Sequence, residues 1–130
     1  MEAASVLSRR IRVVIADDHE LFIAALEAIL AGDERIEVVG LARDGRQAVE
    51  LTRSLEPDVV LMDISMPVLD GLEATVQIRA EREGACVLML TGSNSSQDID
   101  RARRAGAAAY VTKDRIAVEL VEAIVELASR

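Results

Sequence analysis

The chain has 130 residues, of which 51% are hydrophobic and 29% are charged, a composition that fits one folded domain with an apolar core. A net charge of −8 and an aromatic content of only 2% argue against direct binding of nucleic acid, which relies on basic and stacking side chains. No apolar run is long enough to cross a membrane, and the single Cys86 allows no internal disulfide, so we expect a cytoplasmic protein.

Segments with the patterns of strands and helices alternate after residues 1–10, which we expect to be a loose leader. Short apolar runs predict strands over residues 11–16, 36–42, 57–62, 86–90 and 107–111. Amphipathic segments predict helices over residues 20–31, 45–55, 71–82, 96–105 and 115–129, with Asp44, Asp70 and Asp114 at helix starts. This alternation predicts a single α/β domain over residues 11–130, with a parallel sheet covered on both faces.

Reactive side chains follow four of the five predicted strands. Asp17 and Asp18 come after the first strand, Asp63 after the third, Thr91 after the fourth and Lys113 after the fifth. Ligands of open parallel sheets bind beyond the carboxyl ends of the strands, where the winding reverses, so we expect these side chains to share one crevice. The second strand ends on nothing reactive and therefore belongs outside the first. This reasoning predicts a doubly wound sheet of order 2-1-3-4-5, which is the flavodoxin-like order.

Three carboxylates in one crevice require a cation, because two unit charges about 4 Å apart repel by about 4 kcal/mol at an effective dielectric constant of about 20. Mg²⁺ suits such a site, since it takes one or two carboxylates and completes its coordination with water and phosphate oxygens. Lys113 offers a point charge for phosphate, and Thr91 offers a hydroxyl that can donate to a phosphoryl oxygen. Asp63 is then either a third metal ligand or a nucleophile that forms an acyl phosphate.

Four motifs in order, IADDHELF, DVVLMDISMPVLDG, LTGS and GAAAYVTKD, resemble those of the receiver domain of two-component response regulators over about residues 11–128. The resemblance implies that Asp63 accepts a phosphoryl group from a histidine kinase with the help of Mg²⁺. It also implies a signalling phosphoacceptor rather than an enzyme. DDHELF and YVTKD are most similar to the LuxR/NarL-type subfamily, whose members usually append a DNA-binding domain. Control of transcription is therefore the implied output, although no output domain is recognisable within this chain.

The resemblance further implies roles for individual residues. The Mg²⁺ ligands are expected to be Asp18, Asp63 and the backbone carbonyl of Ser65, with Asp17 acting through water. Lys113 is expected to contact the phosphoryl group, while Thr91 both binds that group and moves with Tyr110 as a conformational switch. Many receivers carry Pro after the Lys, in a cis peptide, but Asp114 follows Lys113 here, and a cis bond without Pro costs about 2.5–4 kcal/mol.

Two other classes of protein keep part of this pattern. An aspartate-nucleophile phosphohydrolase would place a second acid two residues after Asp63, where this chain has Ser65. A stand-alone or pseudo-receiver module that only docks partners would keep the fold without the chemistry. The complete set of acidic, hydroxyl and lysine side chains favours phosphorylation over both. His19 has no second His to pair with, and we interpret it as a first-turn or capping residue.

The predicted fifth helix has an apolar arc about twice as wide as a helix needs to rest on a sheet, which leaves Val118 and Val125 beyond the sheet-facing side chains. On the first helix, Ile23 stands where LuxR/NarL-type receivers often carry a charged residue. Right-handed crossovers put these two helices on the same face of the sheet. We therefore expect a homodimer or an output-domain contact through them, with Ile23, Val118 and Val125 at the interface.

Overall fold

The computed structural model describes residues 9–92 and 95–130, so most of the expected leader lies outside the described residues. Five parallel strands form one sheet of order β2-β1-β3-β4-β5, which confirms the predicted order. The strands are β1 (Ile11–Ala16), β2 (Ile36–Ala42), β3 (Val59–Asp63), β4 (Val87–Thr91) and β5 (Ala109–Thr112). The helices are α1 (Glu20–Ala31), α2 (Gly45–Leu55), α3 (Gly71–Glu81), α4 (Ser96–Ala105) and α5 (Ile116–Ala128), with a 3₁₀ turn η1 (Lys113–Arg115) before the last.

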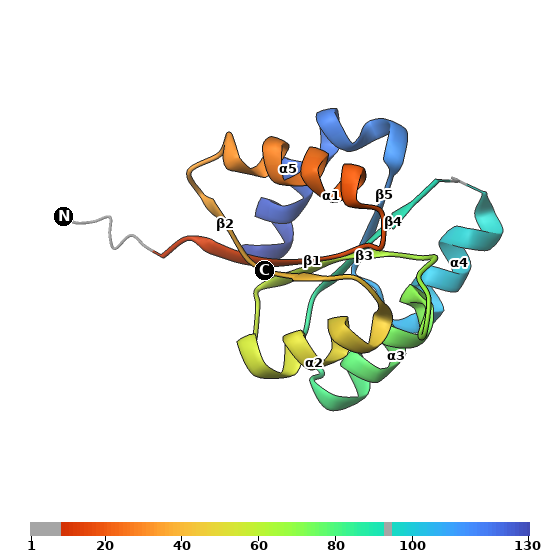
Figure 1. The fold of residues 1–130 in the computed structure, drawn as a ribbon. Coiled ribbons are helices and arrows are strands. Elements are labelled where there is room, and N and C mark those ends of the chain that lie inside the picture. Colours follow the sequence, from red (N-terminus) through yellow and green to blue (C-terminus); the bar gives the residue numbers. More distant parts are fainter. Residues whose placement is uncertain (1–8, 93–94) are drawn as a thin grey trace.

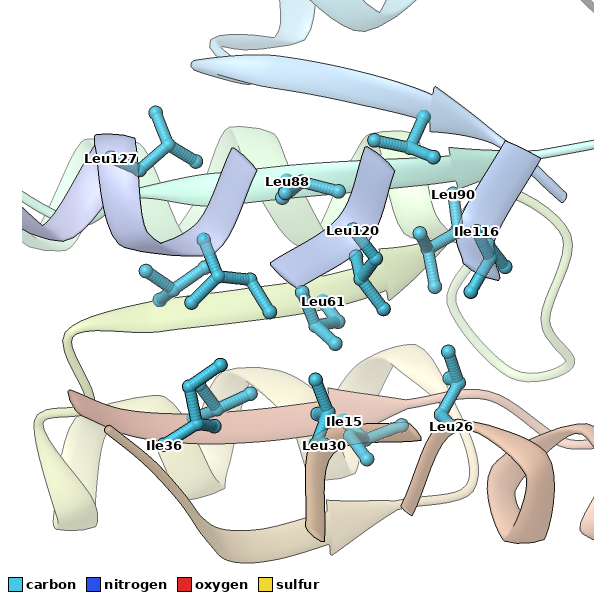
Figure 2. Close-up of a cluster of buried hydrophobic side chains, with 14 of the residues drawn as sticks. Ile15, Leu26, Leu30, Ile36, Leu61, Leu88, Leu90, Ile116, Leu120 and Leu127 are labelled. Atoms are coloured by element: carbon cyan, nitrogen blue, oxygen red, sulfur yellow. The ribbon is translucent and has the colours of Figure 1, made fainter. Parts of the chain in front are cut away.

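The helices form two layers, with α1 and α5 on one face of the sheet and α2, α3 and α4 on the other (Figure 1). Side chains alternate along each strand, so that Val13 and Ile15 enter one buried cluster while Val14 and Ala16 enter the other. In the first cluster, Leu61, Leu88 and Leu90 of the sheet meet leucines and isoleucines of α1 and α5 (Figure 2). Aliphatic packing on both faces therefore holds the strand ends in fixed positions.

Two predicted strand boundaries differ from the structure in a way that affects the site. Asp63 and Thr91 are the last residues of β3 and β4 and do not follow them, because their backbones still pair with Leu90 and Thr112 in the sheet. Each side chain is therefore attached to a rigid ladder position.

The prediction that Ile23 lies on the surface of α1 is wrong. Ile23 is 3% exposed and lies on the same helical stripe as Leu26 and Leu30, which face the sheet. Leu21 is the large apolar residue of α1 that is exposed. On α5 the sheet-facing prediction is confirmed, since Ile116, Leu120, Ile124 and Leu127 are buried.

Val118 of α5 is 70% exposed, whereas Val125 is half-buried.

The helix starts were predicted correctly at Asp44 and Asp70, whose side chains accept hydrogen bonds of 2.8 Å from the backbone N–H groups of Gln47 and Glu73. Asp114 is not a cap. It lies in η1, which runs directly into α5, so that Arg115 takes the N-cap position without a side-chain hydrogen bond.

The last two residues of the expected leader are fastened to the domain. Arg9 donates two hydrogen bonds to Asp58, at 2.7 and 3.0 Å, and Arg10 donates to the backbone oxygens of Glu34 and Ile36 at 3.1 and 2.8 Å. The attachment therefore begins before β1.

The two edge strands are irregular or short. The pairing of β1 with β2 shifts between Val13 and Val14, which leaves Val39 of β2 without a partner residue in the ladder. β2 also carries the exposed Glu37, and β5 is only four residues long. None of the helices in the described part of the chain has the length and apolar character of a membrane span.

Candidate functional site

The predicted site residues lie together at the carboxyl ends of β1, β3 and β4. Lys113 of η1, which directly follows β5, lies at the same edge of the sheet. Asp17 directly follows β1, and its backbone N–H donates to the oxygen of Ala42 at 2.9 Å, which extends the β1–β2 ladder by one residue. The Asp17 side chain is completely buried, whereas that of Asp18 is about a third exposed. The two neighbouring carboxylates thus occupy different environments.

His19 lies against both of these carboxylates. Its Nδ1 atom is 3.2 Å from Oδ1 of Asp17 and 3.2 Å from Oδ1 of Asp18, and its backbone N–H donates to Oδ1 of Asp17 at 2.8 Å. His19 does occupy the N-cap position of α1, as predicted, but its side chain makes no capping hydrogen bond. The ring instead belongs to the acidic cluster.

Asp63 is paired with Lys113 inside the site. The Lys113 Nζ atom lies 3.1 Å from Oδ1 of Asp63 and 3.7 Å from Oδ2 of Asp17. The same ammonium group lies 4.4 Å from the centroid of the Phe22 ring, a cation–π contact that fixes its position from the α1 side. Lys113 is therefore held between two buried carboxylates. The Lys113–Asp114 peptide is trans, since the described residues contain no cis peptide bond.

The electrostatics of the cluster leave room for a further cation. Burial raises the pKa of Asp63, the Asp17 carboxylate raises it further, and Lys113 only partly opposes these effects. Oδ2 of Asp17 and Oδ2 of Asp63 are buried, and neither has a hydrogen-bond partner among the residues that the structure describes. Asp17, Asp18, His19 and Asp63 each offer a ligand atom within 4.8 Å of the others. Oxygen ligands with unsatisfied lone pairs fit a hard divalent cation such as Mg²⁺.

The loop between β3 and α3 closes over Asp63. The Gly71 backbone N–H donates to the oxygen of Ile64 at 2.7 Å, and a side chain at Gly71 would collide with the backbone oxygen of Asp63. Within this loop Val68 has a φ of 69°, a left-handed conformation that is strained for a β-branched residue, and it is 75% exposed. The tight return of the loop keeps Ser65 beside Asp63 on the wall of a cavity.

That cavity has a volume of about 340 Å³ and opens above the strand ends. We call it the strand-end cavity, defined by its lining residues His19, Asp63, Ile64, Ser65, Thr91, Gly92, Asp98, Arg101 and Lys113. Through this cavity, the buried carboxylate of Asp63, the side chain of Lys113 and the buried Thr91 are accessible from solvent. Its dimensions suit a small anion accompanied by an ion and water.

Comparison with protein families identifies this arrangement. Residues 13–125 match the family model described as the response regulator receiver domain. The chain belongs to the response regulator receiver family. The receiver resemblance seen in the motifs is thereby confirmed, as is the flavodoxin-like strand order.

Curated relatives of this receiver domain include two regulators from Bacillus subtilis. It is 39% identical over 119 residues to the transcriptional regulatory protein LnrK, covering 92% of this chain and 54% of LnrK. It is 40% identical over 114 residues to the transcriptional regulatory protein LiaR, covering 88% of this chain and 54% of LiaR. The chain thus spans about half the length of these relatives.

Among solved structures, the signal receiver domain of the putative response regulator NarL from Mycobacterium tuberculosis superposes with a TM-score of 0.89 at 33% identity. The match covers 94% of this chain and 98% of that one. The similarity to LuxR/NarL-type receivers is therefore confirmed.

Tyr110 of this receiver domain lies away from the acidic cluster. It is half-buried on β5 and lines a second cavity of about 320 Å³, together with Ile99, Ala102 and Arg103 of α4. Val118 and Val125 also lie outside the site, on α5. The structure thus brings together Asp17, Asp18, Asp63, Ser65, Thr91 and Lys113, and does not bring Tyr110 to them.

Some residues of the site were not assigned to it from the sequence, among them His19, which was interpreted only as a first-turn or capping residue. Asp98 and Arg101 of α4 line the strand-end cavity, and Phe22 of α1 supports Lys113. A sequence signal exists for Asp98 and Arg101, since an Arg three residues after an Asp on a helix suggests an ion pair. Nothing in the sequence alone indicates that this pair faces the strand ends.

Proposed function

We propose that this receiver domain accepts a phosphoryl group on Asp63 from the phosphohistidine of a sensor histidine kinase. The observation that supports the proposal best is the position of Asp63, a buried carboxylate 3.1 Å from the Lys113 ammonium group on the wall of an open cavity. A nucleophile needs access to its substrate, and a transferring phosphoryl group needs positive charge beside it.

In the proposed transfer, a carboxylate oxygen of Asp63 attacks phosphorus while the bond from phosphorus to the imidazole nitrogen breaks. The electron pair of that bond stays on the imidazole, which takes one proton from solvent. The product is an acyl phosphate on Asp63. Lys113 stabilises the phosphoryl oxygens as a point charge, and the Thr91 hydroxyl donates to one of them in this proposal.

Mg²⁺ is the proposed cofactor, held by Asp18, Asp63 and the backbone carbonyl of Ser65, with Asp17 acting through water. When bound, the ion supplies positive charge to the transferring phosphoryl group. The site residues suit a bound cation, since Asp17 and Asp63 each have a buried oxygen without a hydrogen bond among the described residues.

The domain acts in this proposal as a phosphoacceptor and not as a turnover enzyme. It promotes its own phosphorylation and, slowly, the hydrolysis of the acyl phosphate. A phosphohydrolase remains the weaker alternative, because Ser65 occupies the place of the second acid. A docking module without chemistry is also disfavoured, because the buried Asp63–Lys113 pair serves no docking purpose.

The proposed output is control of transcription through a DNA-binding domain. LnrK and LiaR are transcriptional regulators of which the match covers only 54%, and this domain itself is acidic. We place it in the cytoplasm, with Thr91 and Tyr110 as the switch that changes contacts with the output domain. A homodimer through α1 and α5 stays a prediction, with Val118 and Val125 in its surface and without the buried Ile23.

The test is phosphorylation by acetyl phosphate in Mg²⁺, measured as the mass of the intact protein. The wild type and D44N are expected to gain one phosphoryl group, and D63N to gain none. D44N is the matched control, because it removes an Asp charge from a helix cap that Asn also supports. EDTA and D18N are expected to suppress the reaction without unfolding the domain. Equal labelling of D63N and D44N would remove Asp63 as the acceptor.

A further variant separates chemistry from switching. K113A is expected to retain some phosphorylation but to lose the dependence of partner affinity on phosphorylation. Unchanged phospho-dependent affinity in K113A would contradict the role of Lys113.

A further inference from the structure

Part of the wall of the strand-end cavity is formed by α4. Arg101 and Asp98 of that helix line the cavity and face each other at i, i+3 spacing. The distance from Arg101 Nη1 to Asp98 Oδ1 is 3.5 Å, whereas charge-assisted hydrogen bonds from nitrogen to a carboxylate are usually about 2.7–2.9 Å. The Arg101 side chain is 57% exposed, so the guanidinium group is lightly held and can change partner.

The other basic side chains that line this cavity are already engaged in the described structure. Lys113 lies between Asp63 and Asp17, and His19 lies 3.2 Å from both Asp17 and Asp18. Among the basic side chains that line the cavity, Arg101 has the longest separation from its nearest carboxylate partner in the described structure, 3.5 Å, against 3.1 Å for Lys113 and 3.2 Å for His19. It is also the group whose geometry suits a phosphoryl group, because a guanidinium fork can donate two parallel hydrogen bonds to phosphate oxygens.

Phosphorylation makes a further cation necessary. The Asp63 carboxylate carries one negative charge, and a phosphoryl group in its place carries about 1.5 to 2 at neutral pH. The added charge enters a cavity that also contains Asp98. A bound Mg²⁺ is present before and after the transfer, so it does not offset the increase. A guanidinium group that moves from Asp98 to the phosphoryl oxygens would offset the added negative charge.

We infer that Arg101 leaves Asp98 and donates to oxygens of the phosphoryl group on Asp63, acting as a second phosphoryl-binding residue beside Lys113. The inference rests on the proposed function of Asp63. It assigns α4 a direct part in sensing the phosphoryl group, because the helix that carries Arg101 also lines the cavity beside Tyr110 through Arg103.

The test uses the full chain and beryllium trifluoride, an anion that adds to a carboxylate as a mimic of the phosphoryl group. Its dissociation constant is measured by fluorine NMR in Mg²⁺ for the wild type, R101Q, R101K and R103Q. R103Q is the matched control, because Arg103 lies on the same helix with the same i, i+3 spacing to Asp100, at 3.7 Å, but lines the other cavity.

R101Q is expected to bind the mimic about ten-fold more weakly than the wild type, the effect of one charge-assisted hydrogen bond. R101K is expected to lie between them, and R103Q to match the wild type. Removing the competing carboxylate in D98N should leave the affinity unchanged or raise it. The Mg²⁺ affinity measured without the mimic should be the same in R101Q as in the wild type.

Equal dissociation constants for R101Q and R103Q would overturn the inference while leaving Asp63 as the acceptor. Equal weakening by R101Q and D98N would also overturn it, because the pair would then be acting as a structural brace for α4. If the wild type binds the mimic no better than D63N does, the proposed function fails, and the role of Arg101 fails with it.

Discussion

Replacing Asp63 by Asn keeps the shape of the side chain and removes one charge from the acidic cluster. Asp17 and Asp18 each offer an oxygen within 4.8 Å of Asp63, so each repulsion is at least about 3.5 kcal/mol at an effective dielectric constant of about 20, with Asp18 discounted for its exposure. The opposing attraction to Lys113 at 3.1 Å is about 5 kcal/mol on the same scale. Desolvation of the buried carboxylate adds to the repulsion.

Without divalent metal at pH 7, D63N is therefore expected to raise the free energy of unfolding by about 1–2 kcal/mol, or the melting temperature by about 5 °C for a chain of this size. Thermal unfolding in EDTA, followed by circular dichroism, measures the change, and D44N is the control expected to show none. In Mg²⁺ the difference should shrink, because the ion stabilises the wild type and loses a ligand in D63N.

The same interactions of Asp63 determine how the stability of the folded protein depends on pH. Because the pKa of Asp63 is raised above its ordinary value of 3.8, the folded protein binds this proton more tightly than the unfolded chain. Protonation of Asp63 makes its full contribution to the free energy of unfolding below about pH 3.8. This contribution is lost as the pH rises through the raised pKa of Asp63. The advantage of D63N should therefore fade on acidification. A D63N variant that melts at or below the wild-type temperature in EDTA at pH 7 would refute the account of the cluster.

Three further predictions concern the loop between β3 and α3 and, away from the site, the turn between α1 and β2. G71A is expected to lower the free energy of unfolding by about 1–3 kcal/mol in urea titration, because its methyl group would collide with the backbone oxygen of Asp63; an unchanged midpoint would contradict this close packing. V68G is expected to raise the melting temperature slightly. Relief of the left-handed conformation of Val68 stabilises the fold by about 1–2 kcal/mol, and the flexibility of Gly offsets part of this gain. A lower melting temperature would count against strain at Val68. R35A is expected to raise the pKa of Asp33 from about 2 towards 3.8 in an NMR titration, because Arg35 donates to that carboxylate; an unmoved pKa would exclude this cause.

The sheet and the acidic site were predictable because each depends on a short-range pattern. Near-continuous apolar runs mark strands buried on both faces, and reactive residues at their ends indicate the strand order. Asp17, Asp18, Asp63 and Lys113 meet as expected, since parallel strands present their carboxyl ends on one edge. Here the one-dimensional pattern determines the three-dimensional position.

The buried face of α1 and the cavity-lining side chains of α4 were not predictable, for different reasons. The segment ELFIAALEAILA of α1 is apolar almost all round, with only Glu20 and Glu27 charged, so periodicity could not show that Ile23 faces the sheet. The segment SQDIDRARRA of α4 does have an apolar stripe, formed by Ile99, Ala102 and Ala105, but the stripe does not indicate which of the flanking polar side chains line the cavity. For α1, only packing against the sheet determines the rotation of the helix.

The irregular edges of the sheet affect how this domain can meet other molecules. An open sheet offers unpaired backbone groups along its outer strands, where a strand from another chain can add and begin aggregation. The shifted pairing that leaves Val39 outside the ladder distorts the β2 edge, and the charge of Glu37 discourages an incoming strand. At the other edge, β5 offers four residues, which is a short template for addition. Reversible association is thereby directed to helices and loops, where a partner can dissociate again, and away from growth of the sheet.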